Sequence, residues 1–248
     1  MNITVAENKQ ACGSQAAQSA AKLLRTLLAE KEVVRFIAAT GASQFEFLEA
    51  LVAEPGIDWH RTEMFHLDEY VGIGVSHPAS FVRYLQERLT SRVPIKEAVF
   101  IDGAAADPES ERVRVSQRIA EKPVDLAFVG IGENGHLAFN DPPAQFDATE
   151  PYLILDLDEA CRMQQVGEGW FSGIQDVPAQ AFTMSISQIM KAEHIVCTVP
   201  DARKAQAVGQ CLSANQAITP QHPASILRRH RKCEVFLDLE SAALLQNS

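Results

Sequence analysis

The chain has 248 residues, of which 46% are hydrophobic and 22% charged, and its formal net charge at pH 7 is −10. The acidic balance argues against nucleic acid as a partner, because phosphate backbones recruit clusters of Lys and Arg. No apolar run approaches the roughly 18 residues of a membrane span, and the N-terminus lacks the layout of a signal peptide, so we expect no membrane partner and a cytoplasmic location.

Strands and helices are expected to alternate along the chain. A short strand at Ile3 to Val5 precedes apolar residues at helical spacing from Ala16 to Leu28, which predicts an amphipathic helix. Further strands are expected at Val33 to Ala39, Met64 to Leu67, Ala98 to Ile101, Val124 to Val129, Tyr152 to Leu157, His194 to Val199 and Cys233 to Leu237. Further helices are expected around Phe45 to Leu51 and at Pro78 to Leu89, Pro108 to Glu121 and Ala202 to Cys211.

This rhythm predicts an α/β fold in which residues 1–248 form a single domain. The domain is expected to contain a doubly wound, mostly parallel sheet with helices on both faces, a Rossmann-like arrangement of three layers. The five cysteines are odd in number and lack CxxC spacing, so they are expected to be reduced and core-filling. Ligands of such folds bind at the carboxyl ends of the strands, so we look for chemistry in the loops that follow them.

The first such loop reads Thr40, Gly41, Ala42 and Ser43, between a buried strand and a helix. Backbone N–H groups and the positive end of the helix point outward together there, which suits a phosphate. The loop lacks the Gly-Lys-Ser/Thr ending of a P-loop and the GxGxxG pattern of a dinucleotide turn. The alternative is a plain turn in which Ser43 caps the helix.

The second loop brings two adjacent carboxylates, Asp68 and Glu69, to the edge of the sheet. A partly desolvated carboxylate near a phosphate site can have a pKa raised enough to take a proton from carbon. One of the two is therefore a candidate base. The alternative is that Asp68 or Glu69 only caps the next turn.

The third loop, from Gly130 to Pro143, follows the strongest predicted strand and is the richest in functional side chains. Its glycines allow the backbone to approach a ligand closely, and His136 and Asp141 form a pair that can move protons at neutral pH. A single His with scattered carboxylates lacks the spacing of common zinc and iron motifs, so we expect no metal site. The missing G-x-S-x-G elbow argues against serine hydrolase chemistry.

The fourth loop, Pro200 to Lys204, joins a strand to a helix and gives Lys204 a position from which it could bind a phosphate. Lysines in the first turns of helices are usually solvated, so this expectation depends on the other three loops.

Together, these loops resemble those of the glucosamine-6-phosphate deaminase (isomerase) family, whose superfamily includes the 6-phosphogluconolactonases. The resemblance spans nearly the whole chain. It is carried by Thr40 to Ser43, Phe65 to Gly72 with Ser76 to Pro78, Gly130 to Pro142, and Lys204.

The resemblance implies conversion of a 2-amino-2-deoxyhexose 6-phosphate and water into the ketose phosphate and ammonia, without a cofactor. Asp68 would then be the base that moves a proton between C2 and C1, and His136 would assist ring opening, oriented by Asp141 and Asn134. The implied substrate-binding residues are Thr40, Gly41, Ala42, Ser43 and Lys204 at the phosphate, and Glu69, Gly130, Ile131 and Ala138 elsewhere on the substrate.

Several positions depart from the family pattern. In the catalytic and phosphate loops these are Asn134 for Asp in some members, Asp141 for Glu, Ala42 for Gly and Gln44 for Pro. The lid from Gly167 to Phe171 lacks the expected arginine and contains Glu168, so Arg162 is the nearest substitute. Either the lid is built differently or the substrate is not the usual one, and the glycines beside Glu168 would permit a hinge.

Other functions remain open at this stage. A 6-phosphogluconolactonase would hydrolyse a lactone without releasing ammonia, and a sugar-phosphate sensor would bind without turnover. Galactosamine 6-phosphate is an alternative substrate. The segment from Pro142 to Tyr152 has no Arg or Lys, so we expect no activation by N-acetylglucosamine 6-phosphate. The expected partner is a small sugar phosphate, and a homo-oligomer is an alternative to a monomer.

Overall fold

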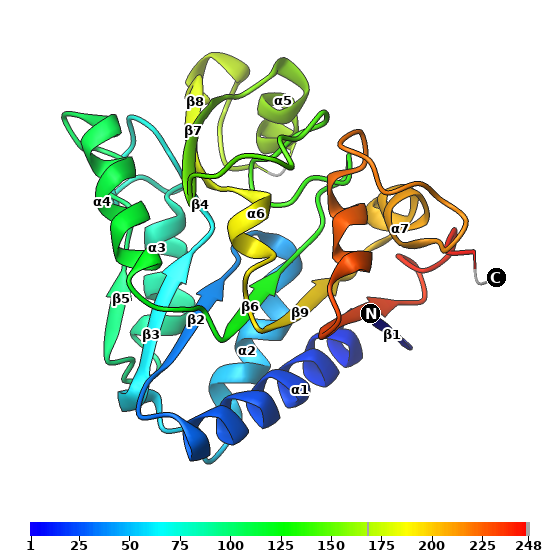
Figure 1. Ribbon diagram of the computed structural model, residues 1–248. Coiled ribbons are helices and arrows are strands. Elements are labelled where there is room, and N and C mark those ends of the chain that lie inside the picture. The colour runs from blue at the N-terminus through cyan, green and yellow to red at the C-terminus, as the bar shows by residue number, and fades with distance from the viewer. Residues whose placement is uncertain (168, 247–248) are drawn as a thin grey trace.

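The computed structural model describes residues 1–167 and 169–246, apart from the side chains of residues 160 and 164. Its central element is a seven-stranded sheet whose neighbouring strands all run parallel (Figure 1). The strand order is β1-β10-β9-β6-β2-β3-β5. The strands are β1 (Asn2–Ala6), β2 (Val34–Ala38), β3 (Thr62–His66), β5 (Glu97–Val99), β6 (Leu126–Val129), β9 (His194–Val199) and β10 (Cys233–Asp238).

Helices pack on both faces of this sheet, because successive residues of a strand point to opposite sides. In β2, Phe36 packs into the apolar cluster of α1 and α2, whereas Ile37 packs into that of α4 and α7. The α-helices are α1 (Lys9–Glu30), α2 (Phe45–Ala53), α3 (Phe81–Leu85), α4 (Pro108–Ala120), α5 (Glu159–Gly167), α6 (Ile186–Ile189) and α7 (Ala205–Leu212). The short helical turns are η1 (Ala42–Gln44), η2 (Trp59–Arg61), η3 (Gln86–Thr90), η4 (Ile174–Asp176), η5 (Ala202–Lys204) and η6 (Pro223–Arg229).

These layers confirm the expected α/β fold with a doubly wound parallel sheet. All five cysteines are free and buried, which agrees with their expected place in the core. Among the described residues, no helix combines the length and the apolar character needed to cross a bilayer.

A second, antiparallel sheet lies above the first and was not predicted (Figure 1). It contains β4 (Asp68–Tyr70), β8 (Gln180–Met184) and β7 (Tyr152–Asp156) in the order β4-β8-β7. The prediction of a strand at Tyr152 was correct, but this strand was expected in the parallel sheet and lies in the antiparallel one. Its partner β8 was not predicted. Apolar periodicity identifies a strand without indicating the direction of the strand that pairs with it.

Helix starts differ from the predicted ones where a side chain caps the helix. The helix predicted from Pro78 begins at Phe81, because Ser80 is its N-cap and accepts a hydrogen bond from the backbone N–H of Arg83. The helix predicted from Ala202 begins as the turn η5 and becomes α-helical at Ala205.

The strand order places the switch point of the sheet between β6 and β2. From there β2, β3 and β5 extend to one side, and β6, β9 and β10 to the other. The connections leaving β2 and β6 therefore diverge and leave a crevice at the carboxyl ends of the strands. The loops at Thr40 and Gly130 border this crevice, and the segments that follow β3 and β9 flank it.

At the opposite end of the strands, buried Arg35 ties β2 to the end of α4. Its guanidinium donates to the carbonyl oxygens of Arg118 (2.7 Å) and Ile119 (3.1 Å) and lies 3.2 Å from the Glu63 carboxylate. We expect Arg35→Met to lower the free energy of unfolding by about 3–5 kcal/mol, because it leaves buried acceptors and a carboxylate without their partner.

Urea unfolding followed by circular dichroism measures this loss. Arg92→Met is the control, because Arg92 forms an exposed ion pair with Glu49 and should contribute less than about 1 kcal/mol. Equal losses in the two variants would contradict the role assigned to Arg35.

Candidate active site

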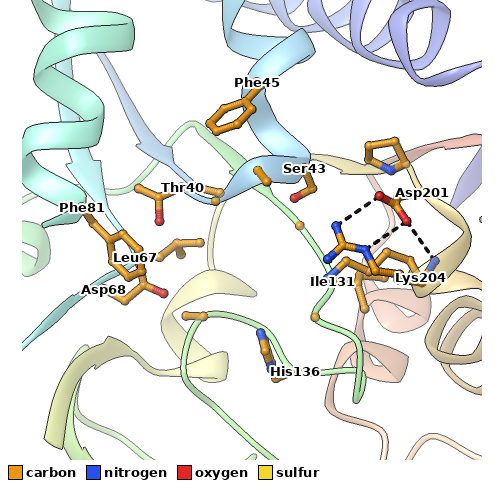
Figure 2. Close-up of a pocket in the computed structure, with 18 of the residues that line it drawn as sticks. Thr40, Ser43, Phe45, Leu67, Asp68, Phe81, Ile131, His136, Asp201 and Lys204 are labelled. Carbon is orange, nitrogen blue, oxygen red and sulfur yellow. Dashed lines mark hydrogen bonds and ion pairs between the residues drawn. The ribbon is translucent and has the colours of Figure 1, made fainter. Parts of the chain in front are cut away.

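A cavity of about 290 Å³ opens at the switch point and is bordered by all four loops singled out in the sequence. Figure 2 shows Asp68 and Lys204 on opposite sides of this space, with Ser43 above and His136 below. The fold thus gathers residues that lie up to 195 positions apart in the chain, from Lys9 to Lys204.

The loop after β2 forms one wall of the cavity, and Thr40, Gly41, Ala42 and Ser43 all line it. Gly41 has φ of 95°, a conformation that favours glycine, and it leads into the turn η1. The departure at Gln44 has a structural explanation, because its buried amide donates to the carbonyl oxygen of Thr198 on β9 (3.2 Å). This bond links the loop to β9, the strand that precedes the loop with Lys204.

The loop after β9 supplies the cations of the cavity. Lys204 is buried although it carries a charge, and it lines the cavity together with Arg203. Asp201 has φ of 93° and accepts a hydrogen bond from the backbone N–H of Arg203, which starts the turn η5. Lys9 of α1 also reaches the cavity, where it pairs with Glu46 at 3.0 Å. Lys9, Arg203 and Lys204 thus line the cavity together with the carboxylates of Glu46 and Asp201. Their ammonium and guanidinium groups are donors that suit a phosphate.

We expect Lys204→Met to raise the KM for a sugar phosphate by roughly tenfold to a hundredfold, because a hydrogen bond to a charged group contributes about 1.5–3 kcal/mol. Steady-state kinetics measure the change, with Lys96→Met as an exposed control. An unchanged KM would show that Lys204 does not bind the phosphate.

Asp68 lies on the other side of the cavity, as the first residue of β4. Only 7% of its surface is exposed, and its Oδ1 has no hydrogen-bond partner in the described chain. Burial, together with the nearby charge of Glu69, raises the pKa of Asp68 to about 8, although a hydrogen bond from the Thr40 side chain opposes the shift. A carboxylate in this state is a strong enough base to act on a carbon acid.

Glu69 departs from its expected role in substrate binding. As the next residue of β4 it points away from Asp68, and it is not among the residues that line the cavity. Its carboxylate accepts hydrogen bonds from the Ser80 hydroxyl (2.8 Å) and from the backbone N–H groups of Tyr70 (2.9 Å) and Val82 (3.0 Å). Glu69 therefore anchors the start of α3, which is the capping role that the sequence left as an alternative for this pair.

His136 lines the cavity from the loop after β6, and two polar side chains support it from behind. Its Nδ1 lies 3.1 Å from Oδ1 of Asp141, and the same oxygen accepts a hydrogen bond from the Asn134 amide (2.8 Å). The Asn134 carbonyl oxygen accepts from the backbone N–H of His136 (3.0 Å). Although burial alone would raise it, the pKa of Asp141 lies below its usual value because His136 and Asn134 bind the carboxylate. The shorter Asp141 thus does reach the imidazole.

The backbone of this loop approaches both the imidazole and the ligand space. A Cβ at Gly132 would overlap the imidazole of His136, so only glycine fits there. Gly130, Ile131 and Ala138 line the cavity, as the resemblance implied.

Helix α5 leads into the segment from Gly167 to Phe171, and the two together form the lid. Arg162 is not a substitute for the missing arginine, because its guanidinium donates to the carbonyl oxygens of Ile174 (2.6 Å) and Val177 (3.0 Å), and it is absent from the cavity lining among the described residues. Glu168, whose charge raised doubt about the substrate, lies outside the described residues. Some lining residues lie outside the four loops and were not predicted, namely Lys9, Phe45, Glu46, Phe81 and Gln165. Others lie within those loops but were given no role, namely Leu67, Phe139, Pro200, Asp201 and Arg203.

The arrangement combines an anion-binding wall, a buried carboxylate of raised pKa and a histidine backed by a carboxylate. It can hold a phosphorylated molecule at one end and move protons at the other.

Residues 7–236 match the family described as glucosamine-6-phosphate isomerases/6-phosphogluconolactonase. The chain is 35% identical over 208 residues to the glucosamine-6-phosphate deaminase of Streptococcus pneumoniae strain 70585, covering 84% of this chain and 86% of the relative. It is 36% identical over 209 residues to that of Exiguobacterium sibiricum, covering 84% and 80%.

Among solved structures, a monomeric glucosamine-6-phosphate deaminase superposes with a TM-score of 0.88 at 26% identity, covering 98% of this chain and 100% of that one. The 6-phosphogluconolactonase of Trypanosoma brucei shares the fold with a TM-score of 0.79 at 17% identity, covering 99% of this chain and 98% of that one.

Proposed function

The chain belongs to the family of glucosamine-6-phosphate isomerases and 6-phosphogluconolactonases, and on that premise we propose that it converts glucosamine 6-phosphate and water into fructose 6-phosphate and ammonia. The observation that carries the proposal is the buried Asp68 carboxylate, whose Oδ1 has no partner in the described chain and which lies in the same cavity as the phosphate wall and His136.

The loop at Thr40 to Ser43 and Lys204 bind the phosphate and so fix the substrate's far end. His136 accepts the proton of the O1 hydroxyl as the ring opens and delivers a proton to O5. With Asp141 ionised behind it, the imidazole can carry the extra proton between these two steps.

Asp68 then removes the proton from C2 of the open aldose while O1 takes a proton from solvent, which leaves an enolamine. Asp68 returns its proton to C1 as the nitrogen releases one to solvent. The nitrogen is now part of a ketimine at C2. Water adds to C2, and ammonia leaves with the electrons of the C–N bond, so that the ketose phosphate remains. A single carboxylate is sufficient for the C2 to C1 transfer, because the proton that it takes is the proton that it returns.

The lactonase alternative has less support. The curated deaminases match this chain at 35–36% identity, whereas the superposed lactonase matches at 17%, a level at which only the fold is shared. A lactone hydrolase needs no base that returns a proton to carbon. Lactone hydrolysis therefore gives no reason for the raised pKa of Asp68.

Ammonia release from a panel of glucosamine 6-phosphate, galactosamine 6-phosphate and 6-phosphogluconolactone tests the proposal. We expect ammonia from glucosamine 6-phosphate. Acid release from the lactone without ammonia from either amino sugar would identify a lactonase, and binding of the sugars without turnover would identify a sensor.

A further inference from the structure

The lid brings a buried amide to the cavity, where it contacts β4, the strand that begins with Asp68. Gln165 of α5 is 6% exposed and lines the cavity. Its Oε1 accepts a hydrogen bond of 2.6 Å from the hydroxyl of Tyr70, which is itself fully buried. Neither the phosphate wall nor the proton-transfer chemistry proposed above requires this amide.

The position of Tyr70 is fixed by its strand and its aromatic neighbours. It follows Asp68 by two residues in β4, so both side chains leave the strand on the same face. The Tyr70 ring packs against Phe81, Phe139 and Phe171, with centroids 5.1–5.3 Å apart. Such a ring has little freedom, and its hydroxyl holds the Gln165 carbonyl oxygen in one orientation.

This orientation determines what the amide can offer. A glutamine side chain has one carbonyl oxygen and an NH2 group with two donors. Because the oxygen binds Tyr70, the NH2 is the part left to bind a ligand, and no residue of the described chain accepts a hydrogen bond from it. Amide donors that lose water on ligand binding need an acceptor, and the ligand must then supply it.

A sugar hydroxyl is the acceptor that fits this place. Figure 2 places Ser43 and Lys204, which would bind the phosphate, away from Asp68 and Phe81. Gln165 is bonded to Tyr70, whose ring packs on Phe81 and Phe139, so the amide belongs to this apolar part of the cavity. Aromatic walls with one oriented donor are typical of sites that select a neutral hydroxylated ligand.

We propose that Gln165 is a specificity-determining residue that donates a hydrogen bond from Nε2 to a hydroxyl of the sugar, with Tyr70 as its positioning residue. This inference rests on the proposed function in taking the ligand to be a sugar phosphate. The lid would then recognise the sugar, and the loops at the carboxyl ends of the strands would bind the phosphate.

Isothermal titration calorimetry with two probes tests the inference. Fructose 6-phosphate carries both phosphate and hydroxyls, whereas inorganic phosphate carries no sugar hydroxyl. For Gln165→Met we expect the Kd for fructose 6-phosphate to rise about fivefold to tenfold, as for one neutral hydrogen bond. The Kd for inorganic phosphate should change by less than about twofold in the same variant, because its contacts lie on the opposite wall.

Three further variants separate recognition from damage to the lid. Gln165→Glu keeps the size of the side chain but removes both donors, and it should weaken fructose 6-phosphate at least as much as Gln165→Met. Gln175→Met replaces an exposed glutamine beyond α5 and should change neither Kd. Tyr70→Phe keeps the ring and removes only its hydroxyl, and we expect a smaller rise for fructose 6-phosphate and none for phosphate.

The inference is overturned if Gln165→Met binds fructose 6-phosphate as well as wild type does, or if both probes weaken equally. Failure of the proposed function is a different observation, because it would show as wild-type protein that releases no ammonia. The ratio of the two Kd values can be measured in either case.

Discussion

Asp68→Asn is expected to lower kcat for ammonia release by at least about a thousandfold, within the range of 10²–10⁴ that general base catalysis contributes. Asparagine has the same shape and cannot accept a proton at these pH values. Fructose 6-phosphate should still bind, because the phosphate wall at Ser43 and Lys204 is unchanged. Ammonia assays and calorimetry on the same preparation measure both quantities.

The pH dependence of the wild-type enzyme gives a second readout of the same residue. The folded pKa of Asp68 is raised to about 8, and only the deprotonated form is a base. Below that pH, kcat/KM should therefore fall about tenfold for each unit of pH. Above it, this acidic limb of the pH profile should level off. Thr40→Val removes a hydrogen bond that lowers this pKa, so the limb should move to higher pH.

Activity of Asp68→Asn within tenfold of wild type would exclude Asp68 as the base. A limb that stays in place in Thr40→Val would show that another group controls it.

The sequence was sufficient to find the loops that border the cavity, because each follows a buried parallel strand. Buried strands have continuous apolar runs, and parallel strands place their carboxyl ends at one edge, so Asp68, His136 and Lys204 could be expected to converge. The order of the strands, which sets the switch point, depends on helix crossovers that periodicity does not encode.

The residues that sequence reasoning missed or misassigned lie where the second sheet and the lid meet the first sheet. Glu69 was predicted to belong to the same site as Asp68 because the two residues are adjacent. In a strand, however, adjacent side chains point to opposite faces. Since β4 was not predicted, this alternation could not be applied. Gln165 gave no signal at all, because a polar residue in an amphipathic helix is usually solvated, and only its contact with Tyr70 shows otherwise.

His136→Gln is the second large effect, with an expected loss of roughly a hundredfold to a thousandfold in kcat/KM on the cyclic sugar. Asp141→Asn should also lower the rate, by roughly tenfold to a hundredfold. An asparagine amide can donate to Nδ1, which would move the imidazole proton to Nε2. Nε2, which lies beside Gly132, could then no longer accept a proton from the substrate. Asp147→Asn, an exposed carboxylate farther along the same loop, is the matched control and should have no effect.

The double variant His136→Gln with Asp141→Asn distinguishes orientation of the imidazole from an independent role of the carboxylate. Asp141 contacts His136 and is not itself among the residues that line the cavity, so its contribution should require the imidazole. The double variant should then be no slower than His136→Gln alone, because groups that act as a unit are not additive. If the two losses multiply instead, Asp141 acts on the substrate by a route that bypasses His136, and the ring-opening role proposed for the pair is wrong.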